Sequence, residues 1–364
     1  MSNTNRTIRV VVADDSEFVC RLLVSHLQSD PDIQVVGTAP NGLRAVQIIK
    51  ELRPDAVTMD LEMPLMNGLE ALEQIMHESP TPVIVISGVS RRAASVTLQA
   101  LEAGAIDFIL KYTPGVDTNP ELLRREIISK VRSASQIRVV RSLRVQKPEL
   151  QPFPIASASA IGLSEATATA REAVPFLPGG VVVIGASTGG PVALRDLLGN
   201  LPGDFSAAVL VVQHMPATFT KVLAANLNRA VPMKVKEAES IDRLEPGLVL
   251  VAPGGYHLLI GTDSRIRLTE GPEVEGHRPS IDVTMQSVTQ LYGARTKGIL
   301  LTGMGKDGCM GLVSIRAKGG KTFVQDAESC VVNGMPQSAI EMGVVDYVAP
   351  PQEIAKLLMA TIGR

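Results

Sequence analysis

Ser187 lies where a buried strand is expected to turn sharply into a helix, a place where a serine can act as a nucleophile. Residues 181–184 are apolar and β-branched, which is typical of a strand buried on both faces. Gly185-Ala186-Ser187-Thr188-Gly189 follows and matches the G-x-S-x-G nucleophile-elbow pattern, and Pro191 suits the first turn of a helix. A catalytic serine is one interpretation; a phosphate-binding glycine loop and a plain strand-to-helix turn are the alternatives.

A serine nucleophile needs a general base, and His214 is the favoured candidate among five histidines. It directly follows the apolar run 209–212, so it is expected, like Ser187, at the carboxyl end of a strand. His257, in an expected hairpin, and His277, in a polar loop, are the alternatives. No histidine spacing in the sequence suggests a zinc site.

The base in turn needs a carboxylate that orients it, and Asp307 is favoured for this role. It follows the expected strand 298–301 through a glycine-rich loop, whose backbone N–H groups could face an oxyanion. Asp282 and Asp326 are competitors at less informative places. The chain order serine, histidine, aspartate differs from the serine, acid, histidine order of α/β-hydrolases, so that fold is not expected.

A second group of polar residues stands at strand ends near the N-terminus: Asp14, Asp15, Asp60, Ser87 and Lys111. Three carboxylates at one edge of a sheet repel one another and need a cation, and hard oxygen ligands favour Mg²⁺. An anion that joins the metal to the lysine would complete the site. The pattern therefore predicts a phosphoryl group on Asp60.

Alternating strand and helix patterns position both sets of residues. Residues 8–134 alternate five times, which predicts a doubly wound α/β domain with a five-stranded parallel sheet. Strands are expected at 8–13, 33–37, 56–59, 83–86 and 108–110, and helices at 17–28, 43–52, 69–77, 94–103 and 121–132. Residues 135–180 are rich in Pro, Ala, Ser and Thr and are expected to be a flexible linker.

Residues 181–364 form a second expected domain, again α/β with a mostly parallel sheet. Beyond the turn at Ser187, strands are expected at 207–213, 248–252, 256–260, 265–268, 298–301 and 321–325. Helices are expected at 192–198, 219–227, 283–291, 308–318 and 352–360.

Composition limits the class of protein. The chain has 364 residues with 45% hydrophobic and 3% aromatic content, so its cores must be aliphatic. A formal net charge of −2 gives no overall field for nucleic acid. Three cysteines without a C-x-x-C motif indicate reduced thiols, and no signal peptide or membrane-spanning run is apparent. A cytoplasmic protein is expected.

The first domain resembles the receiver domain of two-component signalling. The motifs that carry the resemblance are 12–16 (Val-Ala-Asp-Asp-Ser), 59–68 (Met-Asp-Leu-Glu-Met-Pro-Leu-Met-Asn-Gly), 86–88 (Ile-Ser-Gly) and 107–111 (Asp-Phe-Ile-Leu-Lys). The resemblance implies that Asp60 is the phosphoacceptor, Ser87 the switch hydroxyl and Lys111 the partner of the phosphoryl group. It implies Mg²⁺ ligands from Asp14, Asp15, Asp60 and the backbone carbonyl of Glu62. Tyr112 departs from the Lys-Pro usual in this family, which leaves the aim of Lys111 open.

The second domain resembles the chemotaxis protein-glutamate methylesterases (CheB type). The matching blocks are 185–190 (Gly-Ala-Ser-Thr-Gly-Gly), 213–216 (Gln-His-Met-Pro), 277–282 (His-Arg-Pro-Ser-Ile-Asp), 301–308 (Leu-Thr-Gly-Met-Gly-Lys-Asp-Gly), 333–336 (Asn-Gly-Met-Pro) and 339–340 (Ala-Ile). The resemblance covers nearly the whole chain except the linker. It implies Ser187 as nucleophile, His214 as base and Asp307 as orienting carboxylate. The Met304 backbone N–H would help hold the oxyanion, and Thr188 and Arg278 would line the site.

This resemblance implies a phosphorylation-regulated hydrolase that demethylates glutamate methyl esters on chemoreceptor helices, releases methanol and may deamidate glutamines. A histidine kinase would supply the phosphoryl group, Mg²⁺ would serve the receiver, and hydrolysis itself would need no cofactor. An adaptor without catalysis is the rival from another class. A nucleotide-binding oxidoreductase would need the second glycine of G-x-G-x-x-G, and a DNA-binding regulator would need a basic helix-turn-helix; the sequence has neither.

Overall fold

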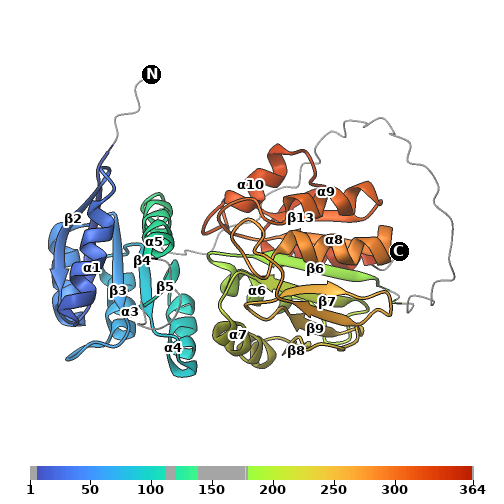
Figure 1. Cartoon of the computed structure of the whole chain (residues 1–364), viewed down its shortest axis with the longest axis horizontal. Helices are drawn as coiled ribbons and strands as arrows, with labels where there is room; N and C mark the ends of the chain where they lie inside the picture. Colours follow the sequence, from blue (N-terminus) through green and yellow to red (C-terminus); the bar gives the residue numbers. More distant parts are fainter. Residues whose placement is uncertain (1–5, 112–119, 138–176, 178, 363–364) are drawn as a thin grey trace, which may run out of the picture.

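The structure is a computed structural model that describes residues 6–111, 120–137, 177 and 179–362. It contains two α/β layered domains lying side by side (Figure 1). Most of the predicted linker 135–180, and Tyr112, lie outside the described residues. Among the helices that the structure describes, none is long and apolar enough to span a bilayer.

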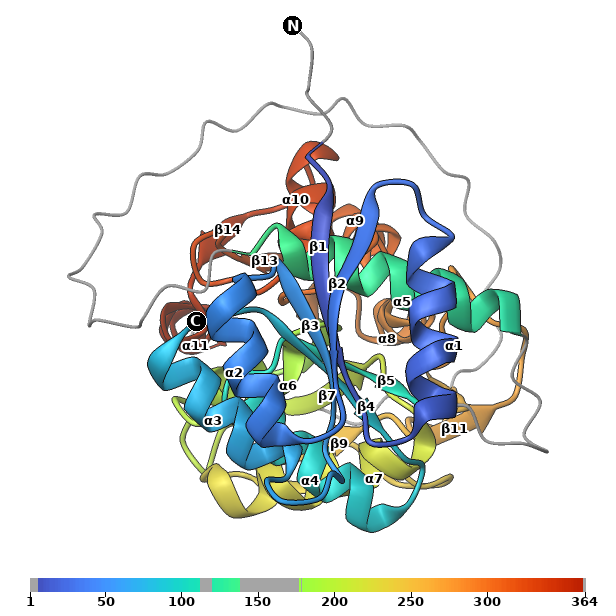
Figure 2. The same ribbon diagram turned by 90° about the vertical axis from the view of Figure 1, so that its left-hand side faces the viewer.

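The N-terminal sheet has the order β2-β1-β3-β4-β5, and all its pairings are parallel. This confirms the predicted doubly wound five-stranded fold. Helices α1 and α5 contact each other on one face, while α2, α3 and α4 line the other (Figure 2). The strands are β1 (Ile8–Ala13), β2 (Ile33–Ala39), β3 (Ala56–Asp60), β4 (Val83–Ser87) and β5 (Asp107–Leu110). The helices are α1 (Glu17–Gln28), α2 (Gly42–Leu52), α3 (Gly68–Glu78), α4 (Arg91–Glu102) and α5 (Pro120–Ser135).

The C-terminal sheet has seven strands in the order β14-β13-β12-β6-β7-β9-β8, all parallel, beside an antiparallel β10–β11 hairpin. The mostly parallel α/β prediction is therefore confirmed. The strands are β6 (Val181–Ala186), β7 (Ala208–Gln213), β8 (Lys234–Glu237), β9 (Leu248–Val251), β10 (His257–Ile260), β11 (Ile266–Thr269), β12 (Thr296–Leu300), β13 (Lys321–Gln325) and β14 (Tyr347–Ala349). The helices are α6 (Gly190–Leu198), α7 (Ala217–Ala230), α8 (Ile281–Tyr292), the 3₁₀ turn η1 (Gly293–Arg295), α9 (Cys309–Ala317), α10 (Gly334–Glu341) and α11 (Pro351–Ile362).

The sequence analysis missed β8, β14 and α10. Strands β8 and β14 are the two edges of the seven-stranded sheet. Strand β8 alternates charged and apolar residues and β14 has only three residues, so neither shows the continuous apolar run of a central strand. Helix α10 contains Gly334 and Pro336 near its start, which obscure a helical pattern in the sequence.

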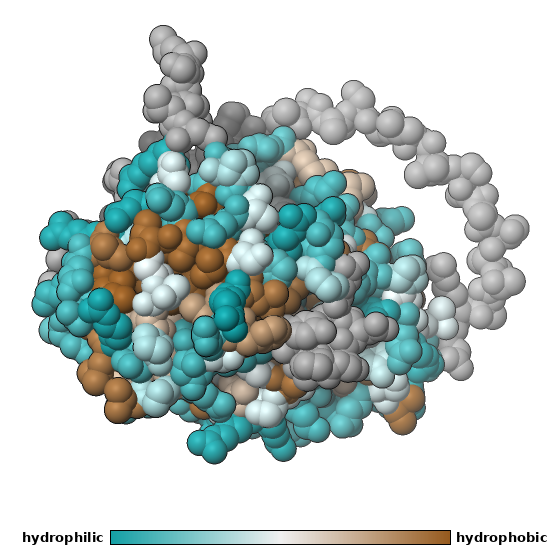
Figure 3. Space-filling view, turned by 60° about the vertical axis from the view of Figure 1, so that its left-hand side comes forward, coloured by the Kyte–Doolittle hydropathy of each residue, from teal (hydrophilic) through white to brown (hydrophobic). Residues whose placement is uncertain are grey.

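Aliphatic side chains fill both cores, as the low aromatic content requires. The largest fully buried side chains are leucines and isoleucines, with Met59 and the rings of Phe219 and Phe323. Figure 3 shows an apolar area on the face of the N-terminal domain that is turned to the viewer. Phe18 and Leu122 of this domain are 63% and 61% exposed.

Candidate active site

Ser187, His214 and Asp307 follow three neighbouring strands of the seven-stranded sheet. Strand β6 lies between β12 and β7. The chain continues from β6 to β7 on one side, and the later strand β12 pairs with β6 on the other side, so the strand order reverses at β6. Ligand sites of open parallel sheets form at such a switch point, outside the carboxyl ends of the strands. Backbone hydrogen bonds join the three ends: Ser187 N donates to Thr302 O at 3.0 Å, and His214 N donates to Ala186 O at 3.1 Å.

The turn that presents Ser187 depends on glycines. Gly189 has a φ of 78°, in the left-handed region that favours glycine. A Cβ at Gly190 would lie 2.0 Å from the Gln213 side-chain oxygen, so no larger residue fits there. The Ser187 carbonyl is held by Gly190 N at 2.8 Å and by the Gln213 side-chain amide at 2.8 Å. These contacts fix the backbone of Ser187, while Ser187 itself remains partly exposed to solvent.

Asp307 is held at the N-terminus of α8 and contacts the histidine. Its carboxylate accepts hydrogen bonds from Ser280 Oγ at 2.9 Å, Ile281 N at 2.7 Å and Asp282 N at 3.1 Å, and lies 2.8 Å from His214 Nε2. Burial by itself would raise the pKa of Asp307, but the hydrogen bond and charge of His214 and the two backbone N–H groups hold that pKa below its usual value. The carboxylate is therefore ionised at neutral pH.

This pairing assigns the proton on His214. An ionised carboxylate only accepts hydrogen bonds, so the proton of the neutral imidazole must sit on Nε2. The other nitrogen, Nδ1, is then the basic one; it is buried and has no hydrogen-bond partner among the described residues. None of the hydrogen bonds found in the described part of the chain joins Ser187 Oγ to His214. Such bonds are often long before substrate binds.

The competing residues have other partners. Asp282 accepts Gly311 N at 2.6 Å, and burial raises its pKa to about 6. Asp326 Oδ1 accepts hydrogen bonds from Ser329 N at 3.2 Å and from Ser329 Oγ. His257 Nδ1 accepts Ser280 N at 3.1 Å and its Nε2 donates to Pro272 O at 2.9 Å, so this histidine supports a loop. Asp307 is the carboxylate that the structure brings to His214.

A second histidine, which the sequence analysis left among the alternatives, lies directly against His214. The rings of His277 and His214 stack with centroids 3.7 Å apart and planes 11° apart. Burial and the charge of His214 lower the pKa of His277 to about 4. Its place in a polar loop gave no signal of this contact, since only the tertiary fold brings the loop onto β7.

Thr188 and Met304, two further site residues predicted from the sequence, both contact the N-terminal domain. Thr188 Oγ1 donates to Asp107 Oδ2 at the start of β5. Met304 Sδ accepts a hydrogen bond from Ser133 Oγ of α5 at 2.7 Å. Arg278 is placed differently: its guanidinium donates to the carbonyls of Glu270 at 3.0 Å and Gly271 at 2.9 Å.

The N-terminal domain faces this site with β5, α4 and α5 (Figure 1). Phe108 of β5 stacks on Phe219 of α7, with ring centroids 4.5 Å apart and planes 7° apart. Lys130 of α5 lies 3.4 Å from Asp107 and donates to Phe108 O at 2.5 Å. Burial by itself would lower the pKa of Lys130, but Asp107 and Glu126 hold it above its usual value, so the lysine is charged.

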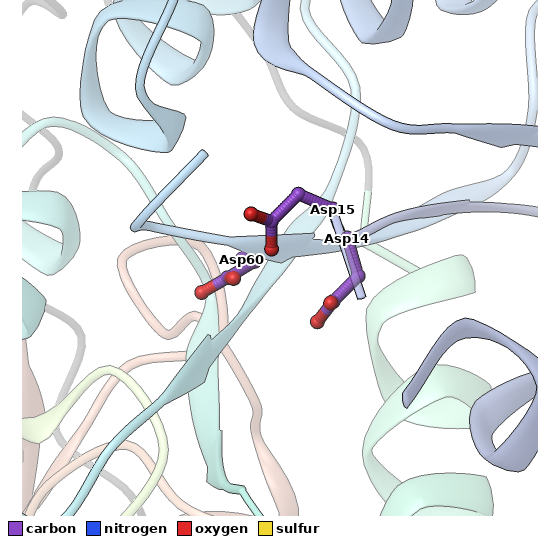
Figure 4. Close-up of side chains that lie close together, drawn as sticks. All are labelled: Asp14, Asp15 and Asp60. Atoms are coloured by element: carbon purple, nitrogen blue, oxygen red, sulfur yellow. The ribbon is translucent and has the colours of Figure 1, made fainter. Parts of the chain in front are cut away.

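The second predicted site lies at the other sheet. The side chains of Asp14, Asp15 and Asp60 lie close together, each with a carboxylate oxygen within 4.8 Å of the others (Figure 4). Lys111 Nζ lies 2.5 Å from Asp60 and 3.7 Å from Asp14. Burial, opposed by Lys111, raises the pKa of Asp60, and burial likewise raises that of Asp14.

These carboxylates fit a hard divalent cation. Asp14 Oδ2 is buried and accepts no hydrogen bond from the described residues, so an acceptor is available to a cation. Glu62 N donates to Asp60 Oδ1 at 3.2 Å, while the predicted contribution of the Glu62 carbonyl stays a prediction. Ser87 Oγ lies 2.6 Å from Thr97 Oγ1 of α4 rather than at Asp60.

Known proteins resemble the chain along its whole length. The CheB methylesterase family model matches residues 182–358, and the response regulator receiver domain model matches residues 10–117. A protein-glutamate methylesterase/protein-glutamine glutaminase of Symbiobacterium thermophilum is 41% identical over 98% of both chains. One of Pyrococcus abyssi is 40% identical over all of this chain and 95% of its own. The crystal structure of the Thermotoga maritima CheB methylesterase catalytic domain is 42% identical, with a TM-score of 0.49 over 50% of this chain and 98% of that one. This chain therefore belongs to the family of response-regulator protein-glutamate methylesterases/protein-glutamine glutaminases.

Proposed function

We propose that this protein hydrolyses glutamate methyl esters on chemoreceptor helices with Ser187, His214 and Asp307, under the control of phosphorylation at Asp60. The observation that carries the proposal is the 2.8 Å contact between His214 Nε2 and Asp307, beside Ser187 at one edge of the sheet. It leaves His214 Nδ1 as a basic nitrogen in a buried setting. The relatives' names supply the substrate class.

In the first half of the reaction, Ser187 Oγ attacks the ester carbonyl carbon while His214 Nδ1 takes its proton. The tetrahedral oxyanion is stabilised by backbone N–H groups, with Met304 N–H as the proposed donor. Methanol then leaves with the proton from His214, and an acyl-enzyme ester on Ser187 remains. Asp307 stays ionised throughout and stabilises the imidazolium.

In the second half, water attacks the acyl-enzyme while His214 again accepts a proton. The bond to Ser187 breaks, the serine regains its proton, and a free glutamate side chain is released. A glutamine side chain would follow the same steps with ammonia as the leaving group, because both substrates pass through a tetrahedral intermediate. Thr188 and Arg278 are proposed to line this site.

The regulatory half of the proposal rests on the contacts between the domains. Asp107 holds Thr188, the residue after the nucleophile, and Ser133 holds Met304, the proposed oxyanion donor. A receiver in this position restricts Thr188 and Met304, the two residues proposed to act beside Ser187. Phosphorylation of Asp60 by a histidine kinase is proposed to release these contacts.

Asp14, Asp15 and Asp60 would hold the Mg²⁺ that serves phosphorylation. When bound, the cation supplies positive charge beside the phosphoryl oxygens. Lys111 adds a second positive charge, and Ser87 supplies a hydroxyl that can donate to the phosphoryl group. For this, Ser87 must leave Thr97.

The test is methanol release from a methylated chemoreceptor fragment by wild type and Ser187→Ala, each with and without acetyl phosphate and Mg²⁺. We expect release by wild type that rises with the donor, and a loss of about 10⁶-fold in Ser187→Ala, as for removal of other serine nucleophiles. Unchanged release by Ser187→Ala would contradict the catalytic assignment. Binding of the fragment without release by wild type would favour an adaptor.

Replacement of Thr97 by valine is expected to make activation easier. Thr97 Oγ1 donates to Ala93 O at 2.8 Å, so Ser87 is the donor in the shorter 2.6 Å bond with Thr97, while Gly88 O lies 3.2 Å from the Ser87 hydroxyl. Valine keeps the shape but removes this acceptor, which weakens the unphosphorylated arrangement by about 1 kcal/mol. The acetyl phosphate concentration that gives half activation should fall by roughly three- to fivefold.

Thr97→Ser is the matched control, because it keeps the hydroxyl. Its dose–response curve for acetyl phosphate should lie close to wild type. If the Thr97→Val curve coincides with both, the hydroxyl pair has no part in coupling the phosphorylation site to α4.

A further inference from the structure

His277 covers one face of the proposed general base. Its ring lies 3.7 Å from that of His214 and almost parallel to it, at 11°. The hydrogen bond to Asp307 holds the Nε2 edge of His214 but leaves rotation about that bond possible. A flat group packed on the face limits this rotation, so it also limits where Nδ1 points.

The loop that carries His277 is built to hold it still. Val274 and His277 exchange both backbone hydrogen bonds, at 3.1 Å and 3.0 Å, across a two-residue turn. Glu275 and Gly276 have φ values of 53° and 78°, as a type I′ turn requires. The turn places His277 at a fixed position immediately before the segment that binds Asp307.

Further contacts fasten both ends of this loop to the domain. His257 donates to Pro272 O at 2.9 Å and accepts Ser280 N at 3.1 Å. The Arg278 carbonyl accepts Gly255 N at 3.0 Å, and the Arg278 guanidinium donates to the carbonyls of Glu270 and Gly271. The backbone that carries His277 is therefore held in place by the loop's own hydrogen bonds, and the ring extends from it onto His214.

The charge state of His277 suits this position. Burial, the charge of His214 and, more weakly, Lys130 of α5 lower its pKa to about 4, while Asp307 opposes them. His277 is neutral near pH 7, so it adds no like charge beside the imidazolium that forms on His214. The face of a neutral aromatic ring also attracts a cation stacked on it.

We propose that His277 is a positioning residue for this reaction: its ring holds the plane of His214, keeps Nδ1 aimed at the serine proton and covers the imidazolium. The inference rests on the proposed function. It assigns to His277 no contact with the substrate and no proton transfer. A planar aromatic ring is what the role requires, and the ring nitrogens are dispensable.

The test compares His277→Ala and His277→Phe in the full chain with acetyl phosphate and Mg²⁺ present. Alanine removes the packed ring, and kcat should fall by about 10- to 100-fold, because misplacement of a catalytic group by about 1 Å has effects of this size. KM for the receptor fragment should change by less than about threefold, since ground-state binding is retained. Phenylalanine should restore kcat to within about fivefold of wild type, because it keeps the stacking face.

Three controls make the result interpretable. His77→Ala removes an exposed histidine of α3 and should behave as wild type. Thermal unfolding of each variant checks that a lower kcat does not come from a smaller folded fraction. Wild type and Ser187→Ala define the full and the lost activity.

The outcomes separate the two proposals. If wild type releases methanol and His277→Ala has an unchanged kcat, the role of His277 is overturned. The same holds if alanine and phenylalanine lower kcat equally, because the ring face would then be irrelevant. If folded wild type releases no methanol at all, the hydrolase proposal itself fails.

Discussion

Asp307→Asn is expected to reduce kcat for methyl-ester hydrolysis by about 10⁴-fold, the size of effect seen when an orienting aspartate in a serine triad becomes asparagine. The Asp307 carboxylate accepts hydrogen bonds from His214, Ser280 and the backbone N–H groups of Ile281 and Asp282. Asparagine offers one accepting oxygen where the carboxylate offers two. Whichever way its amide is turned, an NH₂ group meets a donor.

The amide orientation that places the NH₂ group against His214 changes the tautomer of the imidazole. It makes Nε2 an acceptor and moves the imidazole proton to Nδ1, so the nitrogen that should act as base is blocked. The measurement is methanol release at saturating receptor fragment, together with thermal unfolding of the variant. Loss of kcat with an intact fold is expected.

Asp326→Asn is the matched control for this substitution. Asp326 accepts a hydrogen bond from Ser329 and has none with His214. The kcat of the Asp326→Asn variant should therefore stay within about twofold of wild type. A folded Asp307→Asn protein that retains a tenth or more of wild-type kcat would contradict the role of Asp307 as the orienting carboxylate.

Asp60→Asn is expected to abolish the response to acetyl phosphate while leaving the basal rate of methanol release in place. Asp60 Oδ2 lies 2.5 Å from Lys111 Nζ and within the cluster formed with Asp14 and Asp15. An amide cannot form the acyl phosphate, and it removes one of the charges that attract the cation. The measurement is methanol release as a function of acetyl phosphate concentration.

Asp55→Asn provides the comparison within the same domain. Asp55 stands immediately before β3, at the end opposite to Asp60, and binds Arg6 and the backbone of Arg9. This variant should respond to the donor as wild type does. Withholding Mg²⁺ from wild type should reproduce the Asp60→Asn behaviour; activation that persists in Asp60→Asn would place the phosphoryl group elsewhere.

Much of the fold could be predicted because the central strands are continuous apolar runs. Strands β3, β4, β6 and β7 are buried along their whole length. Their sequences are therefore mostly apolar and can be recognised as strands without the structure. The edge strands β8 and β14 pack on fewer neighbours and escaped prediction. Parallel strands have their carboxyl ends at one edge, which is why Ser187, His214 and Asp307 could be grouped before the structure was known.

The choice among competing residues could not be made in this way. Asp282 and Asp307 are both buried, but in the folded structure Asp307 contacts His214 Nε2 while Asp282 accepts a hydrogen bond from Gly311 N. The stacking of His277 on His214 depends on a turn between Val274 and His277 and on anchors from distant loops. No spacing pattern encodes such contacts.

The sequence by itself determined the two α/β sheets, the strand ends at which reactive groups stand and the residue types available there. Local propensity and hydrophobic periodicity act over a few residues, so a single chain read in order reveals them. The tertiary structure decided which carboxylate meets which histidine, which nitrogen of His214 is left basic, and that Asp107 and Ser133 of one domain hold Thr188 and Met304 of the other. These are contacts between segments far apart in sequence, and side-chain packing across the two domains fixes them.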